Sequence, residues 1–81
     1  MTKEQLFKWI ETGRELEFDY EGNKYSIIYF MKDGERFISF CQFYQDVVDV
    51  KTTDELWNST YNGMKVLDIL SSVPEDDVYV F

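Results

Sequence analysis

The chain has 81 residues, which limits it to one domain with a small core. Hydrophobic residues make up 44% of it and aromatic residues 19%, which excludes a disordered chain. Its formal net charge of −8 repels nucleic acid and anionic membrane at long range, so we expect no direct binding to either.

A capping-box pattern opens the chain, with Thr2 as the N-cap and Gln5 three residues later. Gly13 stands where a glycine commonly ends a helix. The apolar residues between them recur at helical spacing, and they are Leu6, Trp9 and Ile10. The sequence therefore predicts a helix over about residues 3–12 that packs on one face of a sheet.

The next stretch predicts a three-stranded antiparallel meander over about 15–21, 24–32 and 35–43. Its two connections are two-residue turns at Gly22-Asn23 and Asp33-Gly34. The first turn would place Tyr20 opposite Tyr25, and the second would place Phe30 opposite Phe37. Because strand side chains alternate, one face of the sheet should carry most of the apolar residues. These are Leu16, Phe18, Tyr20, Tyr25, Ile27, Tyr29, Met31, Ile38 and Phe40.

The opposite face of the meander is mixed. Its first strand carries only acids, whereas its second and third strands carry a strip of apolar side chains. A loop or the C-terminal segment could cover this strip. It could also bind a partner or a second copy, since contiguous exposed apolar patches are uncommon on monomers. The candidate partner-binding residues are Ile28, Phe30, Phe37 and Phe43.

The pattern weakens after Phe43. Residues 44–51 could continue a strand through Val48 and Val50, but we expect them to form a loop with some extended character. A second capping box at Thr52 predicts a helix over about 53–60, and helical spacing returns over about 64–72 before Pro74. Asn62-Gly63 lies between them, so the region should form one kinked helix or two short ones. Residues 78–81 have strand composition and should pair with a sheet edge or dock on the mixed face.

The sequence offers little catalytic chemistry. It has no histidine, which removes the commonest general base and transition-metal ligand. The single cysteine, Cys41, has apolar neighbours and is interpreted as a buried, inert thiol. Glu75-Asp76-Asp77 lacks the spaced ligands of a calcium loop. We therefore predict a protein that is not an enzyme and has no catalytic, cofactor-binding or metal-binding residue.

Three features favour a cytoplasmic location. A single cysteine cannot form an internal disulfide, the opening residues do not resemble a signal peptide, and no apolar run is long enough to span a bilayer.

One long run of the sequence has a recognisable character. Gly13 to Tyr25, together with Asp54-Glu55-Leu56 and Asn62 to Val66, resembles small uncharacterised proteins from low-GC Gram-positive bacteria and their mobile elements. The resemblance implies a bacterial or prophage origin and carries no activity or site residue with it.

Three functions are compatible with these observations. The first is a non-enzymatic protein-interaction module, homodimeric in one form, that uses the mixed face or a sheet edge. The second is an acidic phage-type inhibitor that mimics nucleic acid on a basic host protein. Its carboxylates would be Glu15, Glu17, Asp19, Glu21 and those of residues 75–77. The third is a small enzyme with a carboxylate site.

Overall fold

The computed structural model covers residues 1–81, which form an α+β fold. It has an N-terminal helix, an antiparallel sheet and short helices after the sheet. The elements are α1 (Lys3–Glu11), β1 (Leu16–Tyr20), β2 (Asn23–Lys32), β3 (Glu35–Gln42), β4 (Val47–Val50), α2 (Thr53–Trp57), β5 (Thr60–Tyr61), β6 (Met64–Lys65), α3 (Val66–Ser71), the 3-10 helix η1 (Glu75–Asp77) and β7 (Tyr79–Val80).

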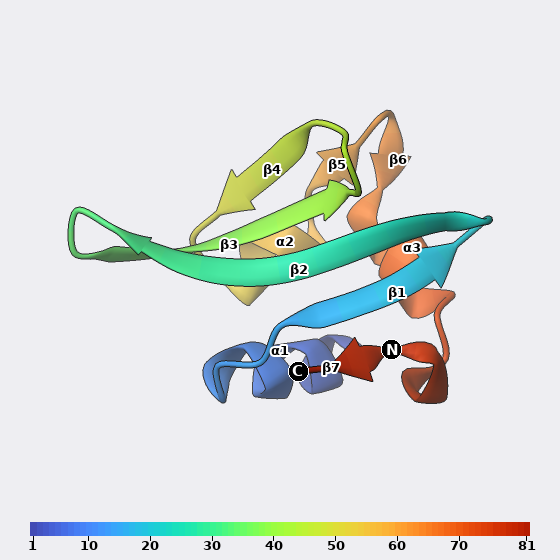
Figure 1. Ribbon diagram of the computed structural model, residues 1–81, viewed down its shortest axis with the longest axis horizontal. Coiled ribbons are helices and arrows are strands. Elements are labelled where there is room, and N and C mark those ends of the chain that lie inside the picture. Colours follow the sequence, from blue (N-terminus) through green and yellow to red (C-terminus); the bar gives the residue numbers. More distant parts are fainter.

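The main sheet has five strands in the order β4-β3-β2-β1-β7, and all neighbours are antiparallel. The helices gather on one side of it, with α1 below β1, α2 behind β2 and β3, and α3 behind β2 and β1 (Figure 1). The C-terminal segment pairs with the sheet edge at β1, which is one of the two placements expected for it. It does not cover the opposite side of the sheet.

The helix α1 begins and ends as its sequence indicates. Thr2 and Gln5 form the reciprocal hydrogen bonds of a capping box. At the other end the N–H of Gly13 bonds to the carbonyl of Ile10 and that of Arg14 to the carbonyl of Trp9, which is the Schellman pattern. Gly13 has φ +77°, and a Cβ there would lie 2.8 Å from the hydroxyl of Tyr29. The glycine thus both ends the helix and lets it approach β2.

The first hairpin differs from the prediction by one turn position. The turn residues are Glu21 and Gly22, with φ +50° and +80°, rather than Gly22-Asn23. Phe18 therefore pairs with Tyr25, and not with Ile27. The prediction was wrong because Gly22 fits either position of a primed turn. Moving the turn by one residue changes each partner by two, so the side chains that remain in the strands keep the faces predicted for them, and only Glu21 moves into the turn.

The second hairpin confirms the predicted register, with Phe30 opposite Phe37 and Lys32 opposite Glu35. The stretch after it was predicted as a loop, but Val47–Val50 forms β4 and pairs with β3. Val48 and Val50 pack against the core, while Asp49 is exposed. Half-buried and exposed positions alternate over only four residues here, and so short a pattern could not distinguish a strand from a loop in the sequence. The meander therefore has four strands rather than three.

The region predicted as a kinked helix or two short helices contains two short helices separated by a small hairpin. Asn62-Gly63 is the turn between β5 and β6, with φ +50° and +80°, and is not a helix end. Tyr61 in β5 is buried, and its hydroxyl accepts from the N–H of Gln42 at 3.1 Å and donates to the carbonyl of Asp46 at 2.6 Å. This hairpin thus fixes the connection between β3 and β4.

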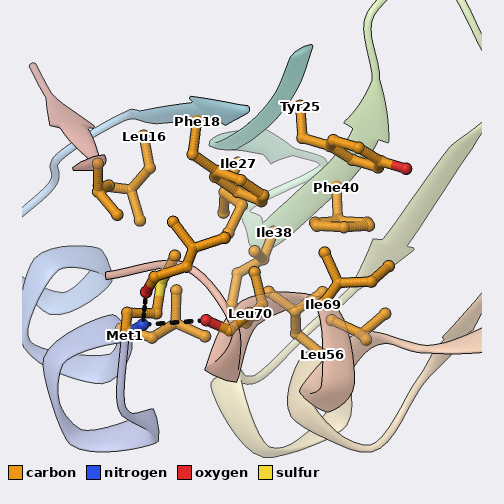
Figure 2. Packing of buried hydrophobic residues seen from close by; sticks show 14 of the residues in the cluster. Met1, Leu16, Phe18, Tyr25, Ile27, Ile38, Phe40, Leu56, Ile69 and Leu70 are labelled. Atoms are coloured by element: carbon orange, nitrogen blue, oxygen red, sulfur yellow. Dashed lines mark hydrogen bonds between the residues drawn. The ribbon is translucent and has the colours of Figure 1, made fainter. Parts of the chain in front are cut away.

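The core lies between the helices and the sheet face predicted to carry most apolar residues. Leu6 and Ile10 from α1, Leu56 from α2 and three residues of α3 meet the sheet there. Figure 2 shows the amino group of Met1 among them, donating to the backbone carbonyls of Leu70 and Val73. The sheet contributes Leu16, Phe18, Tyr25, Ile27, Ile38 and Phe40. Met31, predicted for the same face, is 63% exposed because it lies near the tip of the β2–β3 hairpin.

Aromatic rings fill one end of this core. Tyr25 stacks on Phe18 and Phe40 at centroid distances of 5.6 and 5.7 Å, and its ring meets Tyr61 edge-on at 6.1 Å. Tyr25 is only 3% exposed. Burial, followed by the neighbouring Tyr61, Tyr20 and Glu21, raises the pKa of the Tyr25 hydroxyl above its ordinary value.

We therefore expect the protein to lose stability in alkali. Unfolded Tyr25 loses its proton near pH 10, whereas the folded form keeps it to higher pH. The stabilisation is complete below about pH 10 and is lost above it, by up to about 1.4 kcal/mol per pH unit. Urea unfolding from pH 8 to 11 should show a shallower loss for Tyr25→Phe. The control Tyr44→Phe removes a 99% exposed hydroxyl and should follow the wild type. Equal slopes in all three proteins would contradict this account.

Candidate functional site

The side of the sheet away from the helices is uncovered, and we call it the open face. Strand alternation and register place all four candidate partner-binding residues on it. Ile28 is 40% exposed, and the rings of Phe30, Phe37 and Phe43 are half-buried. The apolar and aromatic side chains of the open face are Ile28, Phe30, Phe37, Phe43, Val47, Tyr79 and Phe81, with the thiol of Cys41 among them.

Phe30 and Phe37 form the centre of one half of the open face. Their rings stack with centroids 5.5 Å apart and planes 20° from parallel. The ammonium of Lys51 lies 5.8 Å from the Phe37 centroid and 3.2 Å from a carboxylate oxygen of Glu35. Each ring is thus half-buried by sheet neighbours and not by a covering segment. The outer surface of the pair remains available for contact.

A shallow depression of about 320 Å³ occupies the other half of the open face. Ile28, Phe43 and Phe81 form its apolar walls. The last of these arrives there because the backbone of Phe81 pairs with that of Glu15 beside β7. The remaining lining residues are Glu15, Leu16, Glu17 and Ser26. Residues from both ends of the sequence therefore meet at one place on the sheet.

The acidic row of β1 is shorter than the alternation predicted. Glu15, Glu17 and Asp19 share the open face, but Glu21 lies in the turn at φ +50°. Asp19 has a cation nearby, since the Lys24 ammonium is 3.7 Å from its carboxylate. Glu15 and Glu17 make no ion pair within the chain. Two unpaired carboxylates thus border the depression.

Cys41 is less buried than its apolar neighbours suggested. The sequence indicated a buried thiol, but Cys41 is half-buried on the open face. Its sulfur lies 3.6 Å from the hydroxyl of Ser26, the residue directly opposite on β2. The difference arises because β3 contacts helices on one side only, so alternate residues of an apolar strand point to solvent.

Two aromatic side chains at the border of the open face were not among the residues predicted to bind a partner. Tyr44 is 99% exposed, has φ +66°, and meets Phe43 edge-on with a centroid distance of 6.1 Å. A bulky residue in the left-handed region is uncommon. Tyr79 is 60% exposed beside Glu17. The pairing of β7 with β1 places Tyr79 here, and the strand composition of residues 78–81 did not indicate which sheet edge they join.

No group of three or more histidine, cysteine or acidic side chains is arranged to hold a metal ion. No helix is both long and apolar enough to cross a bilayer. Comparisons of the chain with protein-family models, with curated proteins and with solved structures found no match. The functional argument therefore rests on the geometry of the open face.

Adjacent isoleucines on β2 provide a direct test of the two faces. Ile27 is 1% exposed and Ile28 is 40% exposed. Ile27→Val should lower the free energy of unfolding by about 0.5–1.5 kcal/mol, as deletion of a buried methylene does. Ile28→Val removes the same atoms from the open face and should change it by less than about 0.5 kcal/mol. Urea unfolding measures both, and an equal cost at the two positions would mean that the open face is covered.

Proposed function

We propose that this protein is a non-enzymatic protein-interaction module that binds through its open face. One observation carries the proposal: a row of apolar and aromatic side chains crosses the sheet on the side that no helix or loop covers. Such patches on small proteins commonly mark interaction sites. The aromatic content of the patch agrees with this role, because Phe and Tyr are enriched in the cores of interfaces.

The charges of the chain narrow the class of partner. The net charge of −8 and the carboxylates on β1 disfavour nucleic acid and anionic lipid. A protein is the partner that an apolar surface with an acidic border fits best. A cytoplasmic location is part of this proposal, because Cys41 is the only cysteine and has no partner for an internal disulfide.

Self-association through the same face is one form of this function. The acidic inhibitor remains a separate hypothesis, and the structure offers it three carboxylates on the strand instead of four. The enzyme hypothesis gains no support from the depression, because its polar lining consists of two exposed or half-exposed carboxylates and the hydroxyl of Ser26, with no basic side chain to activate them.

Light scattering over a concentration series tests the proposal with Phe30→Glu/Phe37→Glu. We expect this variant to stay folded, because both rings border solvent and neither belongs to the core. A wild-type mass that rises towards a dimer and returns to a monomer in the variant would identify self-association. A monomer in both, with the variant folded by circular dichroism, would show the face free for another protein.

The matched control is Phe7→Glu/Met31→Glu, which places two glutamates at apolar positions that are 53% and 63% exposed outside the open face. This control should be folded and should keep the wild-type mass. If Phe30→Glu/Phe37→Glu unfolds while the control folds, the open face is part of the core and the proposal is wrong.

A further inference from the structure

The depression on the open face has apolar walls and an acidic border, and one long basic side chain can contact both. Its apolar walls come from β2, from the end of β3 and from the chain after β7, and its acids come from the start of β1. Its volume, about 320 Å³, lies at the lower end of the range for ligand pockets, about 300–1,000 Å³. It therefore has room for one or two side chains of a partner rather than for a large ligand.

Some carboxylates of the open face are paired with lysines of the chain, and those beside the depression are not. Two of its lysines are already engaged, Lys24 with Asp19 and Lys51 with Glu35. The carboxylates of Glu15 and Glu17 have no cation of the chain beside them. They stand two residues apart on one strand, so their stems are about 7 Å apart. The depression thus has an uncompensated negative border next to an apolar floor.

We propose that the depression receives a lysine or arginine of another protein, carried on a segment that also places an aliphatic or aromatic side chain against the apolar walls. The proposal rests on the open face being the interaction surface. The hydrocarbon stem of the basic residue would pack on Ile28 and Phe43 while its charged end meets Glu15 and Glu17. The faces of the Phe43 and Phe81 rings add attraction for a cation.

A second copy of the chain fits the depression less well. Each copy carries a charge of −8, and of the lysines on its open face Lys24 and Lys51 are paired internally, which leaves Lys32. Bringing two such faces together would place unpaired carboxylates near one another without a matching supply of cations. Charge complementarity therefore favours a basic partner.

The test uses a synthetic peptide that repeats Leu-Ser-Lys-Ser, which in extended form presents leucine and lysine alternately on one side. Titrating it into ¹⁵N-labelled protein should move the amide resonances of Ile28, Phe43 and Phe81 more than those of α2 and α3. Glu15→Gln/Glu17→Gln should weaken binding about tenfold, as the loss of two surface ion pairs would. The control Asp76→Asn/Asp77→Asn removes two charges from η1 and should weaken it less than about twofold.

Two further peptides separate the contributions. One replaces leucine by serine and the other replaces lysine by glutamate, and both should bind at least about fivefold more weakly than the first. Equal weakening by the two charge variants, or resonance shifts away from the depression, would overturn the inference. A peptide that does not bind would also overturn it. In that case the light-scattering result for Phe30→Glu/Phe37→Glu would still decide the proposed function independently.

Discussion

The packing of helices against only one face of the sheet is the constraint on which the rest of the structure depends. The three α-helices have nine, five and six residues, and together they cover the face that carries Ile27, Ile38 and Phe40. A chain of this length buries only about 60–65% of the surface that it exposes when unfolded. None of the elements formed by residues 1–81 covers the other face. The open face thus follows from the placement of all three α-helices on one side of the sheet.

The register of the strands follows from short turns rather than from long-range pairing. The Asp33-Gly34 turn could be predicted because it is a strong hairpin sequence between two alternating runs. The turn before it could not be placed to the residue, since Glu21-Gly22 and Gly22-Asn23 both include the glycine that tolerates positive φ. The faces could nevertheless be predicted, because either turn leaves the same side chains on the same side.

Other parts of the fold were beyond the sequence. Asn62-Gly63 suits a helix end and a hairpin turn equally, and only the packing of Tyr61 against β3 and the following loop selects the hairpin. Only part of the candidate site could be predicted, because some of its residues are placed by local turns and others by pairing between distant segments. Ile28, Phe30, Phe37 and Phe43 lie on local hairpins and could be assigned to one face. Phe81 reaches the depression only through the pairing of the chain end with β1; the strand composition of residues 78–81 indicated a sheet edge but not which one.

The most direct test of this account is the accessibility of the isoleucine methyl groups to an inert, soluble gadolinium chelate, measured by NMR on dilute protein. We predict strong relaxation of the Ile28 methyl and little relaxation of those of Ile27 and Ile38, which are at most 1% exposed. The difference would place the open face in solvent in the free protein. Protection of Ile28 equal to that of Ile27, persisting on further dilution, would mean that part of the chain covers this face, and it would contradict the account.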